Sequence, residues 1–130
     1  MISSSDAHLR SGRGFTLIEL LLVMSLIGLA TSLVAPRLFS AYRKVQVQSE
    51  EKQVLNLLDA ISYSAFIRNR DIKVILSKEN VSVAGKSLLW LEHLTFPETE
   101  LVFIRSGFCD QNKIEYRGGD EIRSMSLPSL

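Results

Sequence analysis

The feature that most constrains this chain is an apolar run of 21 residues, Phe15 to Ala35, near the start of the sequence. Its one charged residue is Glu19. As a helix with about 1.5 Å of rise per residue, the run would span roughly 31 Å, which is enough to cross the hydrocarbon core of a bilayer. A carboxylate at the centre of such a helix costs roughly 2.5–3.5 kcal/mol. We therefore expect a membrane span in which Glu19 has a use.

The residues at the start of the run form a specific motif, Gly14-Phe15-Thr16-Leu17-Ile18-Glu19. This motif resembles the processing site of the type IV pilins and of the pseudopilins of type II secretion. An ordinary secretory signal peptide has its cleavage site after the apolar run, whereas the glycine here precedes the run. A plain signal anchor is the other alternative. A plain anchor explains a carboxylate in the apolar run only in part: Glu19 lies near the N-terminus of the helix, where the helix dipole favours an anion.

The resemblance implies a role for each residue of the motif. Gly14 and Phe15 would be the scissile pair of a prepilin peptidase, and the same enzyme would methylate the new amine of Phe15. Glu19 of an incoming subunit would pair with the Phe15 amine of the subunit before it, in a head-to-tail contact that generates a helical filament. Thr16 supports the motif, although a hydroxyl near a helix start is also common capping chemistry.

The chain divides into four predicted segments. Residues 1–14 are a leader peptide, residues 15–35 a transmembrane helix, residues 36–70 an amphipathic continuation of that helix, and residues 71–130 a β-rich head. Pro36 follows the apolar run at once, and a proline inside a helical pattern kinks or interrupts it. Because a proline at about this place is common in the family, we expect a kinked helix that continues.

The continuation carries an apolar stripe on one face, whose members recur at intervals of three, four and seven residues: Val47, Val54, Leu58, Ile61 and Ala65. Polar residues such as Glu50 belong to a wetter first part of this helix. The short β-rich runs that follow are Ile72–Leu76, Val81–Val83, Leu88–Leu91, Leu101–Ile104, Lys113–Arg117 and Glu121–Met125. We therefore expect an α+β fold, in which the second half of a long helix packs on an antiparallel sheet.

Two local features of the head are also predicted. Gly118-Gly119-Asp120 separates the last two β-rich runs and signals a hairpin. Four aromatic residues at alternating strand positions are expected to pack in the core instead of forming a partner surface: Trp90, Phe96, Phe103 and Phe108.

The charge balance argues against nucleic-acid binding. Loss of residues 1–14 leaves 13 Lys and Arg (15 − 2) and 13 Asp and Glu (14 − 1), so the formal net charge is zero and no basic excess remains. The basic residues near the run do not place its N-terminus in the cytoplasm, because Arg10 and Arg13 precede it whereas Arg37, Arg43 and Lys44 follow it. Only the resemblance implies a cytoplasmic leader, a single pass through the inner membrane and a periplasmic head.

No catalytic residues, metal site or cofactor is predicted. His93 has no second histidine near it in the sequence. Cys109 is the single cysteine, so no intramolecular disulfide is available, and we expect a small side chain at a loop or strand end. Major pseudopilins bind calcium near the C-terminus, which keeps Asp110, Asp120 and Glu121 open as ligands, but solvated turn acids are the favoured interpretation.

The head favours one branch of the family. A helix end, a basic residue, an aspartate and a β-rich run follow one another, which is similar to the H-type minor pseudopilins of type II secretion and the FimT-like minor pilins. We expect a structural subunit of a periplasmic pseudopilus and not an enzyme. Its implied partners are prepilin peptidase, other major and minor pseudopilins and the inner-membrane assembly platform. A minor type IV pilin, and a membrane-anchored periplasmic enzyme or binding module, stay open as alternatives.

Overall fold

The computed structural model describes residues 14–129, so the predicted leader lies outside the described residues except for Gly14. The chain divides after Leu38 into two units. One helix, α1 (Leu17–Arg68), belongs to both units and contains Pro36 in its interior. The expected continuation past Pro36 is therefore confirmed. Proline has no N–H, so the carbonyl of Ser32 loses its partner within the helix.

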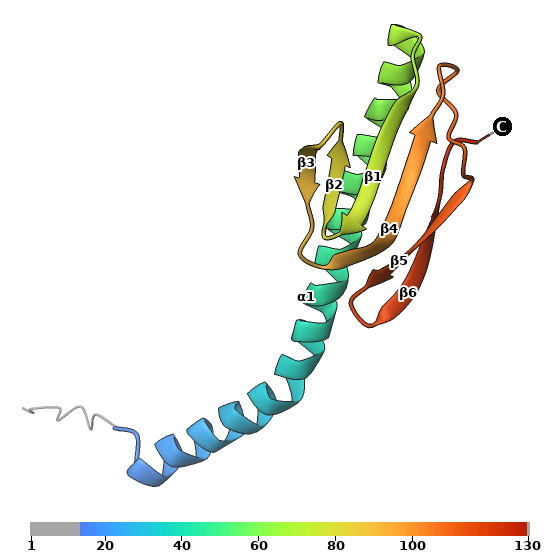
Figure 1. Ribbon diagram of the computed structural model, residues 1–130. Helices are drawn as coiled ribbons and strands as arrows, with labels where there is room; N and C mark the ends of the chain where they lie inside the picture. Colours follow the sequence, from blue (N-terminus) through green and yellow to red (C-terminus); the bar gives the residue numbers. More distant parts are fainter. Residues whose placement is uncertain (1–13, 130) are drawn as a thin grey trace, which may run out of the picture. The chain divides into compact units, whose positions relative to one another are not determined.

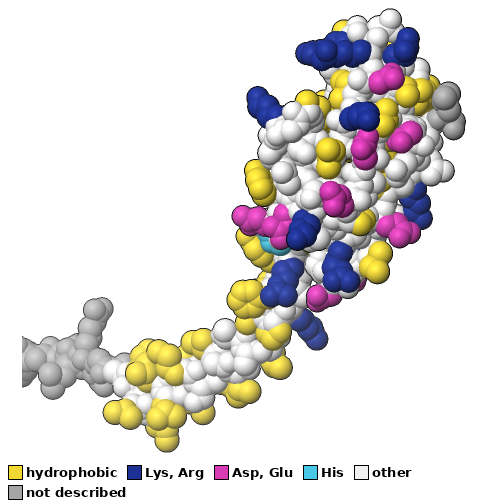
Figure 2. All heavy atoms as spheres, in the orientation of Figure 1, with side chains coloured by type: hydrophobic (Ala, Val, Ile, Leu, Met, Phe, Trp, Pro, Cys, Tyr) yellow, Lys and Arg dark blue, Asp and Glu magenta, His cyan; other side chains and the backbone are white. Residues whose placement is uncertain are grey.

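In the first unit, the described side chains form no hydrophobic core. The large apolar residues are exposed throughout, from Phe15 at 78% and Leu22 at 60% to Leu38 at 64%. Figure 2 shows this part of the helix covered with hydrophobic side chains. Between Leu17 and Arg68 lies an 18-residue window that is long and apolar enough to cross a membrane, with none of its residues buried.

α1 ends two residues earlier than predicted, at Arg68, in a defined cap. Asn69 adopts a left-handed conformation with φ of 48° and donates its N–H to the Phe66 carbonyl at 3.2 Å. Arg70 donates its N–H to the Ala65 carbonyl, also at 3.2 Å. These two bonds form a Schellman motif, which satisfies carbonyls at the end of the helix.

The second unit contains a six-stranded antiparallel sheet beside the second half of α1 (Figure 1). The sheet order is β3-β2-β1-β4-β5-β6, so β3 and β6 are the edges. The predicted α+β fold is confirmed. The strands are β1 (Ile72–Lys78), β2 (Asn80–Val83), β3 (Lys86–Trp90), β4 (Leu94–Phe103), β5 (Lys113–Gly118) and β6 (Glu121–Ser126).

The core lies between α1 and one face of the sheet. The predicted stripe of α1 is confirmed, because its buried residues are Val47, Val54, Leu58, Ile61 and Ala65. On the strands, alternate side chains point inward, as the pleat requires, and the largest of these are Phe96 and Phe103. Full burial of a side chain of this size stabilises the fold by about 1.5–3 kcal/mol. This unit therefore carries its own hydrophobic core.

The prediction of a buried Trp90 is wrong. This side chain is 71% exposed, whereas Phe108 is half-buried. Trp90 lies on the edge strand β3, where Leu89 pairs with the buried Val81 of β2. Since neighbouring residues of a strand point to opposite faces, Trp90 points away from α1.

Strand β4 is much longer than the predicted Leu101–Ile104, and it contains Pro97. A proline cannot donate to a strand ladder and is usually confined to edges. β4 pairs with β5 only through Leu94 and Thr95, so its β5 side has no ladder at Pro97. On its other side β4 pairs with β1 from Phe96 to Phe103. Pro97 is tolerated because β4 and β5 are not paired at this position, so no ladder hydrogen bond to β5 is lost there.

The predicted β5–β6 hairpin is confirmed, with Gly119 and Asp120 in its turn. Gly119 has φ of 65°, which favours glycine. Gly118 is constrained by packing instead: a Cβ there would lie 2.9 Å from Cγ1 of Val47. The hairpin therefore approaches α1 at the first buried position of the helix.

Candidate functional site

The predicted motif residues lie at the N-terminal end of α1, where Thr16 is the residue before the helix. The Thr16 carbonyl accepts the N–H of Leu20 at 3.1 Å, and its Oγ1 accepts the N–H of Glu19 at 3.3 Å. Thr16 is thus the N-cap and Glu19 the third helical residue, the spacing of a capping box. The capping role considered for Thr16 is confirmed, and it fixes the start of α1 two residues after Phe15.

Gly14 and Phe15 precede the helix and have no regular secondary structure. Both are exposed, and an added Cβ at Gly14 would meet no atom within 4 Å. Packing among the described residues therefore gives no reason for glycine at position 14. A protease that binds an extended backbone would supply such a reason.

Glu19 is exposed in the first turn of α1, where the helix dipole favours an anion by about 0.3–1 kcal/mol. It lines a shallow pocket of about 390 Å³ together with Gly14, Phe15 and Thr16. The structure thus brings the predicted cleavage site and the predicted assembly residue to one place. Among the described residues, Glu19 forms no ion pair.

The rest of the apolar run satisfies its own polar groups. Three hydroxyl side chains each donate to a carbonyl about one turn earlier, at 2.8–2.9 Å: Ser25 to Leu21, Thr31 to Ile27 and Ser32 to Leu29. Hydrocarbon provides no water to satisfy such groups, so internal bonding of this kind suits a membrane span. Glu19 is the one side chain of the run whose charge needs a partner from outside.

Residues 9–35 match the family described as the prokaryotic N-terminal methylation motif. This motif supports a protein of the type IV pilin and pseudopilin class. The match covers the end of the predicted leader, the predicted scissile pair, Glu19 and the apolar run, and it implies processing by prepilin peptidase and a membrane-associated assembly. No curated protein and no solved structure matched the chain. The family is therefore carried by the N-terminal motif, while the head is known from its own structure.

The head holds two polar contacts that sequence reasoning missed, and the first involves Glu50. Its carboxylate accepts the backbone N–H groups of Glu92, His93 and Leu94 at 2.9–3.0 Å, and Oε1 lies 2.9 Å from Nδ1 of His93. Burial raises the pKa of Glu50, but the His93 ring and the three N–H groups lower it further, so its pKa lies below the usual value. Glu50 thus binds the β3–β4 connection to α1 and does not simply face water.

The second contact involves the neighbouring Glu51, at the other side of the stripe. Its Oε1 accepts the Tyr116 hydroxyl at 2.8 Å and Nη1 of Arg123 at 2.6 Å. Burial, together with the hydrogen bond and negative charge of Glu51, raises the pKa of Tyr116 above its usual value. Glu51 therefore binds β5 and β6 to the helix. The sequence offered one signal for both contacts. The apolar stripe of α1 is interrupted between Val47 and Val54, and Glu50 and Glu51 lie in this interruption.

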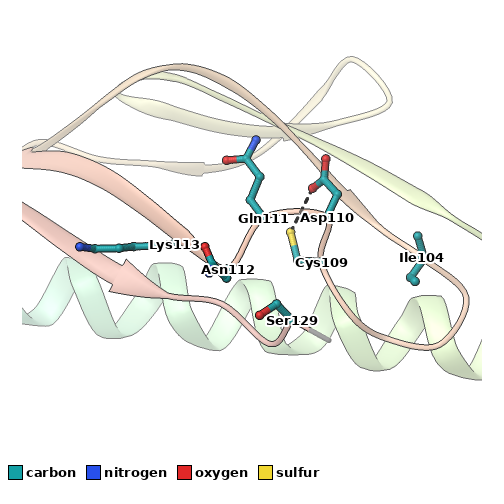
Figure 3. A pocket seen from close by; sticks show the side chains of 7 residues that line it. All are labelled: Ile104, Cys109, Asp110, Gln111, Asn112, Lys113 and Ser129. Atoms are coloured by element: carbon teal, nitrogen blue, oxygen red, sulfur yellow. Dashed lines mark hydrogen bonds between the residues drawn. The ribbon is translucent and has the colours of Figure 1, made fainter.

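Cys109 is buried at an isolated bridge with Phe103, which confirms a small side chain at a strand end. Its thiol donates to Oδ1 of Asp110 at 3.4 Å, the contact drawn in Figure 3. The pocket around them has a volume of about 610 Å³ and includes Lys113. Burial raises the pKa of Cys109, so the unreactive thiol is the favoured form.

The acids considered for calcium have other partners or lie in a turn. Asp110 accepts the Val102 N–H at 3.0 Å, which closes the β4–β5 connection. Asp120 lies in the hairpin turn, and Glu121 is 3.7 Å from Nε of Arg123. Residues 14–129 contain no group of three His, Cys, Asp or Glu side chains arranged to hold a metal. The calcium interpretation thus receives no support from the arrangement of these residues.

Proposed function

We propose that this chain is a minor pseudopilin, a structural subunit of the periplasmic pseudopilus of a type II secretion system. In this proposal it waits in the inner membrane as a single-pass protein with its head in the periplasm. Prepilin peptidase cuts between Gly14 and Phe15 and methylates the new amine. The subunit then joins other major and minor pseudopilins at the assembly platform, and it has no enzymatic role.

The observation that carries the proposal is the exposed apolar helix with a single carboxylate at its capped start. Apolar side chains such as Leu22 bury nothing within the chain, so a bilayer or neighbouring helices must cover them. Both environments leave Glu19 in need of a cation. The new amine of Phe15 in a neighbouring subunit supplies one, and the contact is staggered, as a helical filament requires.

The test is substitution Glu19→Ala in the cell that carries the native machinery. We expect cleavage after Gly14 to continue, because the scissile pair is unchanged, and incorporation into the filament to fall at least about tenfold, since one buried charge pair is lost. The matched control is Glu98→Ala, which removes an exposed acid from the head. Sheared filament fractions and exoprotein secretion give the readout. Normal incorporation of Glu19→Ala would overturn the proposal.

A minor type IV pilin is the second candidate, since the matched N-terminal motif favours it equally. The head gives no specific reason to prefer DNA uptake, because cations and carboxylates are interspersed over the face seen in Figure 2. Deletion of the gene separates the two candidates. Loss of exoprotein secretion supports the pseudopilin, whereas loss of surface pili with intact secretion supports the pilin.

A further inference from the structure

A groove in the second unit has no part in the functions described so far. It lies between the first turns of α1 in that unit and the β5–β6 turn, and its volume is about 280 Å³. Its lining residues from the helix include Ser40, Arg43 and Lys44. From the hairpin come Asp120 and Glu121, among others.

The groove presents charges of both signs. Arg123, which also lines it, is already held by Glu51 at 2.6 Å and Glu121 at 3.7 Å. In the part of the chain that the structure describes, Arg43, Lys44 and Asp120 form no ion pair. A simple anion would meet Asp120, and a simple cation would meet the two basic residues. A ligand that carries both a phosphate and an ammonium group complements the groove better than either.

The position of the groove along the chain points to the membrane surface. Ser40 follows Ala35, the last residue of the apolar run, by five residues of sequence within α1. The headgroup region of a bilayer begins where the span ends, and long basic side chains can reach back toward it. Phe39 and Tyr42 are 69% and 61% exposed, as aromatic residues at a membrane interface are.

The basic residues beyond the run also need an explanation of their own. From Leu20 to Ser49 the only charged residues are Arg37, Arg43 and Lys44. Cations on the periplasmic side of a span work against its expected orientation, because loops outside the cytoplasm usually hold few of them. A contact with lipid phosphates would account for Arg43 and Lys44 at this place.

We propose that this groove binds the headgroup of a phospholipid that carries a phosphate and a primary ammonium, the phosphoethanolamine class. Arg43 and Lys44 bind the phosphate, and Asp120 accepts hydrogen bonds from the ammonium. The contact holds the head against the outer leaflet before assembly. It rests on the membrane anchoring in the proposed function and is independent of which filament the subunit joins.

The test uses the full-length protein in detergent, with native mass spectrometry after addition of three lipids with identical acyl chains. These lipids are phosphatidylethanolamine, phosphatidylcholine and phosphatidylglycerol. We expect the protein to bind phosphatidylethanolamine up to about fivefold more tightly than either other lipid, a ratio that corresponds to the one contact that differs, between Asp120 and the ammonium. Choline cannot donate hydrogen bonds to Asp120, and glycerol carries no cation.

Two variants and a control assign the contacts. Arg43→Gln with Lys44→Gln should weaken binding of phosphatidylethanolamine about fivefold, and Asp120→Asn should remove its preference over phosphatidylglycerol. Lys52→Gln changes an exposed lysine of α1 that does not line the groove, so its binding should match the native protein. If the double variant misfolds by circular dichroism, the single variants Arg43→Gln and Lys44→Gln replace it, each with a smaller loss.

Equal binding of the three lipids, or unchanged binding by the variants of Arg43 and Lys44, would overturn the lipid proposal. A preference for phosphatidylglycerol would overturn it as well, because that result indicates an anion site. Neither result affects the assembly role of Glu19, which is measured by filament incorporation. Conversely, normal assembly of Glu19→Ala would leave a measured lipid preference standing.

Discussion

The two units of this molecule use the same residue types in opposite ways. In the second unit Leu58 is 1% exposed and packs against a sheet, whereas in the first unit Leu22 is 60% exposed on the same helix. The acids differ too. Glu50 is held by three N–H groups of its own chain, while Glu19 has no ion-pair partner among the described residues. The second unit buries a hydrophobic core of its own, whereas the large apolar side chains of the first unit bury nothing among the described residues.

The sharpest test of this difference compares two leucines of α1. Leu58→Ala should lower the free energy of unfolding of the head by about 2–5 kcal/mol, because it leaves a cavity in a packed core. Leu22→Ala should change it by less than about 0.5 kcal/mol, since its side chain contacts no core. Urea unfolding of the full-length protein in detergent, followed by circular dichroism, measures both. Similar losses from the two variants would break the comparison.

The second test concerns Glu50. Glu50→Ala should destabilise the head by about 1–3 kcal/mol, because the N–H groups of Glu92, His93 and Leu94 lose their acceptor. Glu98→Ala, at an exposed position, is the control and should cost little. A Glu50→Ala variant as stable as this control in the same urea experiment would show that the carboxylate does not hold the β3–β4 connection.

Acid should reveal the same contact in the native protein. The pKa of Glu50 is lower in the folded head than its ordinary value of 4.5, so the folded state favours the carboxylate. Its contribution is present above pH 4.5 and is lost as pH falls below that value through the folded pKa. Glu50→Gln should lack this part of the acid dependence. Identical profiles for the native protein and Glu50→Gln would argue against the assignment.

The third test compares two glycines. Gly118→Ala should destabilise the head by about 1–3 kcal/mol, because the new Cβ would lie 2.9 Å from Val47 and force α1 and the hairpin apart. Gly14→Ala should leave stability unchanged, since no atom lies within 4 Å of its added Cβ. If Gly14 serves the protease, however, cleavage of Gly14→Ala should slow. Cleavage at the native rate would remove the argument for an external requirement.

The smallest expected effect is at the helix cap. Thr16→Ala should weaken the first turn of α1 by about 1 kcal/mol, which corresponds to about fivefold faster hydrogen exchange at the Glu19 amide. Thr16→Ser keeps the hydroxyl and should behave as the native protein. Unfolding of the head should not change in either variant. Equal exchange in all three proteins would show that the hydroxyl does not cap the helix.

The parts of the fold that depend on local periodicity could be predicted from the sequence. The stripe from Val47 to Ala65 and the Gly118-Gly119 hairpin follow from helical spacing and from turn chemistry. The exposure of Trp90 could not be predicted, because it depends on which strand is at the sheet edge. The length of β4 could not be predicted either. Pro97 indicates the end of a strand unless it is known that β4 does not pair with β5 at this position.

The candidate site shows the same division. Gly14, Phe15 and Glu19 were found because their spacing is fixed along one stretch of chain. The partners of Glu50 and Glu51 lie more than 40 residues away, so only the folded head brings them together. Local spacing could indicate that two acids interrupt an apolar stripe, but not which strands they bind.

Mass spectrometry of the mature N-terminus measures the processing of the first unit itself, on which its proposed move from the bilayer into a filament depends. We expect a chain of 116 residues (130 − 14) that begins at Phe15 with a methylated amine. A chain that keeps Met1, or one cut after the apolar run, would contradict it, since Glu19 would then have no new amine to meet.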